Sequence, residues 1–192
     1  MTLRQDDTDL DALAAQVRAV PALGDADLSR LLVAARTGDA GARTQLIEQQ
    51  LAAILAGALG RRQTGLDVFD LYQEGAVAAA IAVDEYLAHD DDGPNLRRFV
   101  TRVVERHIDT LVAAEADVQR AAAQMLEDAE LLQAAELVLR RELKRMPTPT
   151  EVGARLDWTP EHVDLVAQTI IAARESFDEE ISLYLDEDDT PN

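Results

Sequence analysis

Three polar side chains, Asp70, Gln73 and Glu74, stand at helical spacing within residues 66–75. On a helix, positions 70, 73, 74 and 77 share one face. A face of carboxylates and an amide suits a partner helix rich in arginine, because guanidinium groups form charge-assisted hydrogen bonds with carboxylates. The same pattern is also that of an exposed polar face on an ordinary amphipathic helix. From the spacing alone, a solvated polar face is the more common interpretation, and a protein-binding stripe is the alternative.

The residue types that usually carry catalysis or bind metals do not form a site in this chain. His89, His107 and His162 lie in different segments, and none has a second histidine at metal-ligand spacing. The chain has no cysteine, which excludes thiolate metal sites and cysteine nucleophiles. No glycine-rich loop follows a strand-like run, so no phosphate cradle is visible. We therefore expect no catalytic residue, no metal, no cofactor and no enzymatic activity.

The charge favours a protein partner over free nucleic acid. The 192 residues include 37 acidic and 18 basic side chains, which gives a formal net charge of −19. A chain this acidic repels phosphate backbones overall, whereas a basic protein surface attracts it. No apolar run reaches the length of about 18 residues that a transmembrane helix needs, and the acidic N-terminus does not resemble a secretory signal. We expect a cytoplasmic protein that does not bind membranes.

The elements that must position these residues are all predicted to be helices, so the fold class is all-α. Apolar side chains recur with helical period throughout, and no segment requires a strand. Asp67 is the expected N-cap of the helix that carries the polar stripe, and Asp25 or Asp27 is the expected N-cap of an earlier one. We expect a short helix within residues 1–20, then helices at about 26–37, 40–59, 68–86, 96–114, 115–145, 150–156 and 159–174.

Residues 146–163 have the outline of a helix-turn-helix. The second helix has a clear start, because Thr159 can cap it and Pro160 suits its first position. Its front carries Glu161, His162 and Asp164, and such an acidic face is a poor probe for a groove lined by phosphates.

Several segments resemble, in order, the sigma-70 family of bacterial transcription initiation factors. The strongest is Leu-Asp-Val-Phe-Asp-Leu-Tyr-Gln-Glu-Gly at residues 66–75, followed by Ala-Val-Asp-Glu-Tyr at residues 82–86. The remaining segments are residues 21–28, 35–39, 46–51 and 147–163. Together they correspond to regions one-point-two, two and three of the family, and no segment resembles region four, which reads the upstream promoter element.

The resemblance implies a domain organisation and a role for the polar stripe. A region-two-like helical domain falls at 21–114 and a small region-three-like helical domain at 115–175, between an acidic segment at 1–20 and an acidic tail at 176–192. The central helix of the family grips the clamp helices of the largest RNA polymerase subunit. The resemblance therefore implies that the polymerase core is contacted by residues at the matching positions, namely Phe69, Asp70, Gln73 and Glu74. The chain departs from the family at Ala76, where the family often has asparagine. This difference implies altered contacts with the clamp helices.

The part of the family pattern that opens DNA is degenerate here. The tryptophan pair that wedges the duplex falls on Arg102 and Val103, the stacking tyrosine on Phe99, and the base-reading glutamine near Arg106. Stacking on aromatic side chains supplies about 1–3 kcal/mol per base, so replacing the pair removes most of the driving force for strand capture. Phe99, Arg102, Arg106 and Arg120 remain as candidate DNA contacts, with a solvated basic face as the alternative.

Three functions follow, in order of preference. The first is a sigma-like transcription factor that binds the polymerase core and regulates initiation without opening promoters by itself, acting alone or with a second protein that supplies region four. The second is a divergent but active sigma factor that recognises promoter DNA. The third is a helical adaptor, or a competitor of polymerase or sigma, that works through its acidic surface.

Overall fold

The computed structural model describes residues 3–89 and 95–187, with side chains from 10 to 89 and from 95 to 178. Every regular element in these residues is helical, which confirms the all-α fold class. The chain divides into two compact units, Met1–Asp117 and Val118–Asn192. Within the described residues, no helix is both long enough and apolar enough to cross a membrane.

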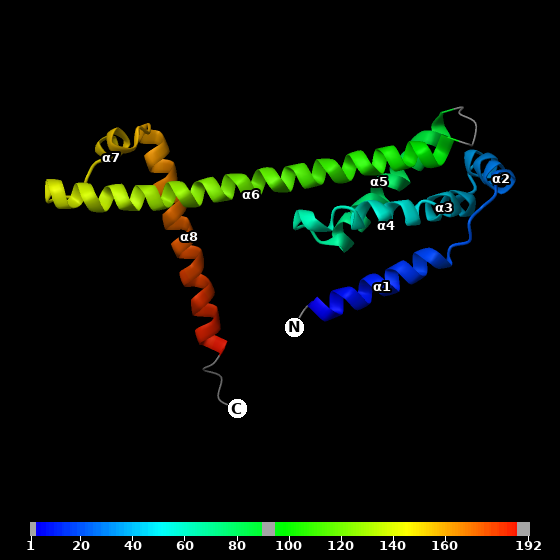
Figure 1. Cartoon of the computed structure of the whole chain (residues 1–192), viewed down its shortest axis with the longest axis horizontal. Helices are drawn as coiled ribbons and strands as arrows, with labels where there is room; N and C mark the ends of the chain where they lie inside the picture. Colours follow the sequence, from blue (N-terminus) through cyan, green and yellow to red (C-terminus); the bar gives the residue numbers. More distant parts are fainter. Residues whose placement is uncertain (1–2, 90–94, 188–192) are drawn as a thin grey trace. The chain divides into compact units, whose positions relative to one another are not determined.

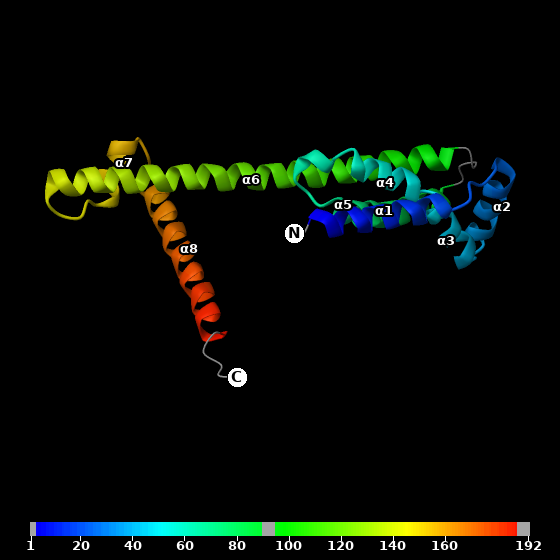
Figure 2. The same cartoon turned by 60° about the horizontal axis from the view of Figure 1, so that its bottom comes forward.

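Unit 1 (Met1–Asp117) consists of several helices, of which α5 (Val68–Ala88) contributes more of the described buried residues than any other. They are α1 (Leu3–Ala19), α2 (Asp25–Arg36), α3 (Ala40–Glu48), α4 (Leu51–Leu59), a 3-10 turn (Arg62–Thr64), α5 (Val68–Ala88) and the first part of α6 (Leu96–Leu143). In both views α4 and α5 run alongside the beginning of α6 (Figures 1 and 2). The core between these three helices is aliphatic and closely packed, with fully buried Ile54, Leu71, Val83, Val100 and Ile108.

Gly75 allows α5 to approach its neighbours closely. A Cβ atom at this position would lie 2.7 Å from Cγ2 of Ile54 on α4 and 3.4 Å from Cδ1 of Ile108 on α6. A separation below 3 Å is a steric clash with a branched side chain that has little room to move. The glycine that ends the family stretch at residues 66–75 is therefore needed for packing within unit 1.

The predicted N-cap residue is correct for α5 and wrong for α2. Asp67 caps α5, because its Oδ1 accepts hydrogen bonds from the backbone N–H groups of Phe69 and Asp70, as predicted. Asp25 and Asp27 do not cap α2, so that prediction is wrong. The N-cap is Gly24, and the two acids lie in the first turn, where the helix dipole favours negative charge.

The predicted helix at 40–59 is two helices, α3 and α4, separated at Gln49 and Gln50. Gln49 has a long-range role: its Oε1 accepts a hydrogen bond from the Leu23 N–H, and its Nε2 donates to the Pro21 carbonyl. Gln50 is buried at 2% exposure, and its Nε2 donates to the Leu46 carbonyl. The break coincides with the long-range contacts of Gln49, and helical period in the sequence does not predict it.

The two helices predicted at 96–114 and 115–145 form the single helix α6. Neither glycine nor proline occurs between Leu96 and Leu143, so nothing in this stretch terminates the backbone hydrogen bonding. No helix end occurs at residue 114, so the predicted division there is wrong.

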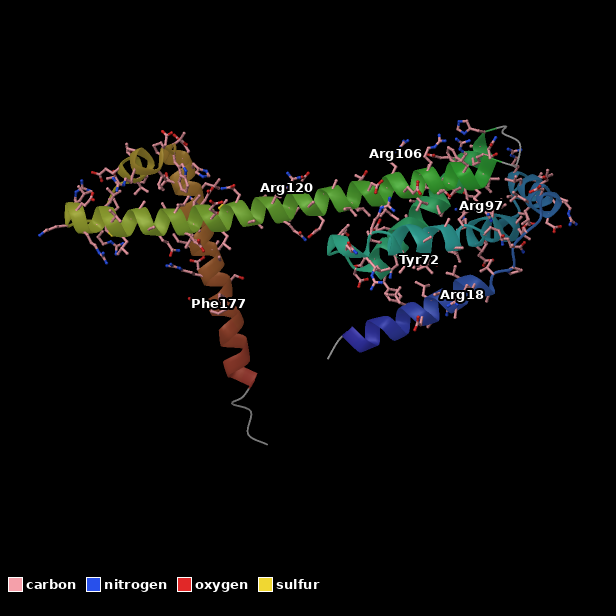
Figure 3. All side chains as sticks on the ribbon, viewed as in Figure 1. Arg18, Tyr72, Arg97, Arg106, Arg120 and Phe177 are labelled. Carbon is pink, nitrogen blue, oxygen red and sulfur yellow. The ribbon has the colours of Figure 1, made fainter. Side chains whose placement is uncertain are left out.

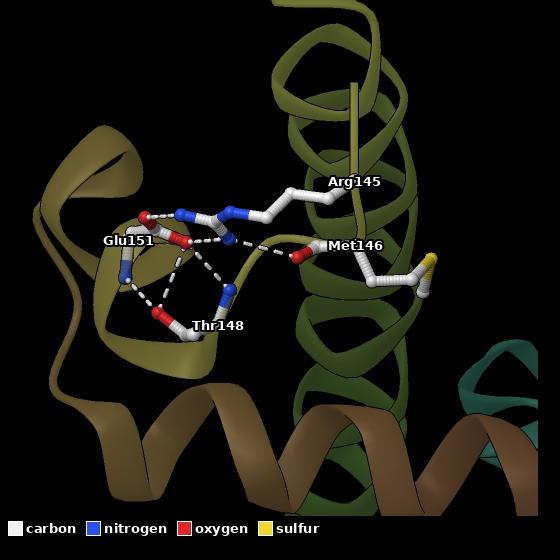
Figure 4. Close-up of polar contacts among 4 residues, drawn as sticks. All are labelled: Arg145, Met146, Thr148 and Glu151. Atoms are coloured by element: carbon white, nitrogen blue, oxygen red, sulfur yellow. Dashed lines mark hydrogen bonds and ion pairs between the residues drawn. The ribbon is translucent and has the colours of Figure 1, made fainter. Parts of the chain in front are cut away.

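Unit 2 (Val118–Asn192) contains the rest of α6 together with α7 (Pro149–Leu156) and α8 (Pro160–Glu187). A capping box starts α7: Thr148 Oγ1 accepts from the Glu151 N–H, and the Glu151 carboxylate accepts from the Thr148 N–H (Figure 4). Arg145 donates two hydrogen bonds to the same carboxylate, at 2.5 and 2.9 Å. The turn after α7 is tight, because a Cβ on Gly153 would lie 2.6 Å from the Trp158 carbonyl oxygen.

The predicted start of α8 at Thr159 and Pro160 is confirmed, with Thr159 Oγ1 accepting from the His162 N–H at 3.3 Å. The helix continues to Glu187, well beyond the predicted end near residue 174, since no glycine or proline interrupts this stretch. Helical backbone therefore extends into the acidic tail expected at 176–192, of which residues 188–192 lie outside the described part. Residues 90–94, an acidic stretch of the sequence between α5 and α6, lie outside it too.

Candidate functional site

The polar stripe predicted from the sequence is exposed on the outer face of α5. Asp70, Gln73 and Glu74 are all exposed, whereas Leu71 and Gly75, their neighbours in the chain, face the core. The helical repeat produces this division, because residues one position apart differ by about 100° around the axis. The acid-and-amide face is therefore open to a partner and is not part of the interior of unit 1.

The positions on either side of the stripe, Phe69 and Ala76, are less exposed than the stripe itself. Phe69, the fourth predicted polymerase contact, is half-buried beside the exposed face. Ala76 is also half-buried and packs against the core of unit 1. The residue that departs from the family pattern therefore belongs to the packed side of α5. On the same side, burial raises the pKa of the Tyr72 hydroxyl (Figure 3).

One carboxylate of the stripe has a partner on the neighbouring helix. Nε2 of His107 on α6 lies 3.1 Å from Oε2 of Glu74, and both side chains are partly exposed. The sequence alone does not indicate this contact, because the two residues are 33 positions apart. The contact limits the orientations of the Glu74 carboxylate and leaves its second oxygen for other donors.

A fixed ion pair lies at the other end of the outer face of α5. Asp84 accepts two hydrogen bonds from Arg43 on α3, 2.5 Å from Nε and 2.7 Å from Nη2. This bidentate contact lowers the pKa of the Asp84 carboxyl and raises the pKa of the Arg43 guanidinium. Asp84 is thus engaged within unit 1 by two hydrogen bonds from Arg43, whereas Glu74 has the single contact with His107.

A second candidate surface lies on α6, where exposed arginines follow one another at four-residue spacing. Arg98, Arg102 and Arg106 are exposed on the side opposite buried Val100 and Val104. Arg106 projects from α6 away from α4 and α5 (Figure 3). Because i and i+4 positions share a helix face, the three guanidinium groups form a basic row on an otherwise acidic chain.

Shallow hollows adjoin this basic row. One of about 280 Å³ is lined by Tyr86, Asn95, Arg98, Phe99 and Arg102. Phe99 is half-buried, and its ring centroid lies 5.7 Å from that of Tyr86. The structure thus places the predicted contacts Phe99, Arg102 and Arg106 on one helix, and Arg98 belongs to the same row. Val103, which stands at a wedge position of the family, is half-buried against the core.

Arg120, the remaining predicted DNA contact, belongs to unit 2 and is exposed (Figure 3). In the helix-turn-helix-like part of this unit, Glu161 and Asp164 are exposed at the start of α8, as expected for an acidic front. His162 instead bonds within unit 2, with its Nε2 3.0 Å from Oδ2 of buried Asp128. The histidine therefore contributes to packing between α6 and α8.

No group of three or more possible metal-binding side chains occurs among the described residues. Each histidine has a polar contact: His89 Nδ1 lies 2.7 Å from the Glu85 carbonyl oxygen, and His107 and His162 each contact one carboxylate. The chemistry available at the two candidate surfaces is therefore recognition by charge, hydrogen bonding and apolar contact.

Comparison with known proteins gives a distant but consistent match. No family model matches the chain. RNA polymerase sigma factor SigA of Lactococcus lactis subsp. cremoris is 27% identical over 136 residues, which cover 71% of this chain and 37% of that protein. The protein of the same name from Lactococcus lactis subsp. lactis (strain IL1403) is also 27% identical over 136 residues, covering 71% and 35%. The chain thus spans about a third of the length of these two relatives.

Proposed function

We propose that this chain, a distant relative of the sigma-70 family, binds the RNA polymerase core through the outer face of α5 and regulates transcription initiation without opening promoters by itself. The observation that carries the proposal is the exposure of Asp70, Gln73 and Glu74 on one helix face. These residues stand where the family grips the clamp helices. The role proposed is that of a non-enzymatic regulator in the cytoplasm.

The electrostatics of the chain support a basic partner at this face. The formal net charge of −19 gives long-range attraction to a basic coiled coil, and such steering raises the rate of association. At short range the carboxylates of Asp70 and Glu74 can accept charge-assisted hydrogen bonds from arginine. The Gln73 amide adds a donor and an acceptor between them.

The second half of the proposal, that promoters are not opened, is supported by the side chains on α6. Arg102 is exposed and Val103 is half-buried, so neither supplies an exposed aromatic ring at the wedge position. Phe99 is partly covered and packs against Tyr86. An exposed ring is what a flipped base needs for stacking.

The test is binding of purified polymerase core to the full chain in low salt. Reversing both stripe charges, Asp70→Arg with Glu74→Arg, is expected to weaken binding by at least about tenfold, because interface charges that lose their partners are costly. The matched control reverses two exposed acids elsewhere in unit 1, Asp11→Arg with Glu48→Arg. If the unmodified chain does not bind the core in low salt, or if both double variants lose binding equally, the proposal is wrong.

A second candidate function, a divergent but active sigma factor, is favoured by one observation. The hollow on α6 combines the Phe99 ring with the guanidinium groups of Arg98 and Arg102. These groups could contact a base and its phosphates. Run-off transcription with core plus this chain would then give product, and Arg106→Ala would reduce it. Absence of product from any genomic fragment would exclude this candidate.

A further inference from the structure

The exposed stripe on α5 is longer than its three polar members. Val77 and Ile81 are 57% and 55% exposed, although both are branched apolar residues. Their positions follow Asp70 and Glu74 at intervals of three and four residues, so all four lie along one line on the helix. The N-terminal half of this face is therefore acid and amide, and its C-terminal half is apolar.

The packing of unit 1 does not explain these two side chains. Large apolar residues of α5 that serve the core are fully covered, with Leu71 at 2% and Val83 at 0% exposure. Val77 and Ile81 lie on the side of α5 opposite Leu71 and Val83. On that side the core does not require apolar residues. Single exposed apolar residues are common, but here two adjoin a polar recognition stripe and share its direction.

The exposed stripe on α5 ends at Asp84. One turn after Ile81, Asp84 is held by Arg43 from α3 in a bidentate ion pair. Because this carboxylate already has its donors, it offers little to an incoming cation. The available surface thus runs from Asp70 to Ile81, a rise of about 16 Å at 1.5 Å per residue, which matches three turns of a partner helix.

We propose that Val77 and Ile81 are the apolar half of the docking face on α5, and that the partner is an amphipathic helix with matching halves. Its basic side chains face Asp70, Gln73 and Glu74, and its apolar side chains face Val77 and Ile81. This inference rests on the polymerase-binding function proposed above. A second copy of this chain fits poorly, because two acidic stripes would face each other.

The two halves of the docking face should differ in how their contribution to binding affinity depends on salt. Attraction between exposed charges is screened, with a Debye length of about 10 Å at 0.1 M and about 3 Å at 1 M salt. Burial of apolar surface is not screened in this way. Binding through both halves therefore keeps a component that survives high salt, and that component depends on Val77 and Ile81.

The experiment titrates purified RNA polymerase core into the full chain, labelled with a fluorophore, at about 0.1 M and about 0.5 M salt. The variants are Val77→Gln and Ile81→Gln for the apolar half, and Glu74→Gln for the polar half. Val33→Gln on α2 is the matched control, because Val33 is 63% exposed and belongs to a different helix. Circular dichroism verifies folding, and Ile81→Ala is a second variant that adds no polar group.

Val77→Gln and Ile81→Gln are each expected to weaken binding about fivefold to tenfold at both salt concentrations, which corresponds to roughly 1–1.4 kcal/mol. Glu74→Gln is expected to weaken binding at low salt and to have little effect at high salt, and Val33→Gln to have none. If Glu74→Gln weakens binding while both apolar variants bind normally, the inference is wrong and the proposed function stands. If the unmodified chain binds at neither salt concentration, both are wrong.

Discussion

His107 and Glu74 join α6 to the recognition face of α5, with Nε2 of the imidazole 3.1 Å from Oε2 of the carboxylate. An exposed pair of this kind contributes little to stability, but it restricts the orientations that Glu74 adopts before binding. Restricting a side chain before binding lowers the entropy cost of association. In the proposed binding mode, the contact therefore contributes to recognition and little to folding.

We expect His107→Ala to weaken binding of the polymerase core by about twofold to fivefold without changing the melting temperature measurably. His107→Gln should restore most of the affinity, since its amide N–H can donate to the same carboxylate. The measurement is the fluorescence titration together with thermal unfolding by circular dichroism. Equal affinities for the unmodified chain and both variants would show that His107 does not position Glu74.

Gly75→Ala is expected to destabilise unit 1 by about 1–3 kcal/mol, because the added methyl group overlaps Ile54 on α4. Gly57 provides a matched control on the neighbouring helix. A Cβ there would meet its nearest atom at 3.7 Å, an ordinary contact. Gly57→Ala should therefore stabilise by up to about 1 kcal/mol through helix propensity. Urea unfolding followed by circular dichroism distinguishes the two, and destabilisation by both variants alike would contradict the packing argument.

The capping box of α7 should make unit 2 sensitive to acid. Hydrogen bonds from Arg145 and from the Thr148 backbone lower the pKa of Glu151 from 4.5 to about 2. Because the pKa is lower in the folded state, the stabilisation is complete above about pH 4.5 and is lost as the pH falls through about 2.

Thermal unfolding at several pH values tests this, with fluorescence of Trp158, the single tryptophan of the chain, as a reporter of unit 2. The difference in melting temperature between the unmodified chain and Glu151→Gln should be largest above pH 4.5 and should shrink toward pH 2. Glu161→Gln, the same exchange at an exposed position of α8, is the control. A difference that does not vary across this pH range would exclude the proposed role of Glu151.

If the basic row on α6 contacts phosphates, its arginines should determine the salt dependence of binding to single-stranded DNA. Arg98→Ala and Arg102→Ala should each reduce the slope of log K against log salt by about 0.7 for every phosphate that the variant no longer neutralises. The control is Arg30→Ala on α2, an exposed arginine that pairs with Asp27. Identical slopes for the row and the control would identify the row as a solvated face.

The sequence was most informative where local chemistry decides the structure. The cap at Asp67, the restart at Thr159 and Pro160, and the outward direction of Asp70 and Glu74 all follow from local hydrogen bonding and helical period. These features need no knowledge of the tertiary fold. The stripe could therefore be placed on its helix face before the structure was known.

The features that sequence reasoning missed depend on contacts between distant segments. The break between α3 and α4 lies at Gln49, which bonds to the backbone at Pro21 and Leu23. The pairing of His107 with Glu74 spans two helices, and helical period within either segment gives no sign of it. Ile81 was missed for a related reason, because an apolar residue on a helix is normally assigned to the core until the opposite side is seen to be packed.

The close approach at Gly75 divides the Asp-Leu-x-Gln-Glu-Gly stretch into two kinds of position. Leu71 and Gly75 are fixed by the interior, whereas Asp70, Gln73 and Glu74 are free to change without harming the fold. A homologue that no longer binds this partner would keep Leu71 and Gly75, because the core requires them. It would lose Asp70, Gln73 and Glu74 through neutral substitution. Among homologues of this chain, the surface trio is therefore the part of the motif that separates inherited architecture from retained activity.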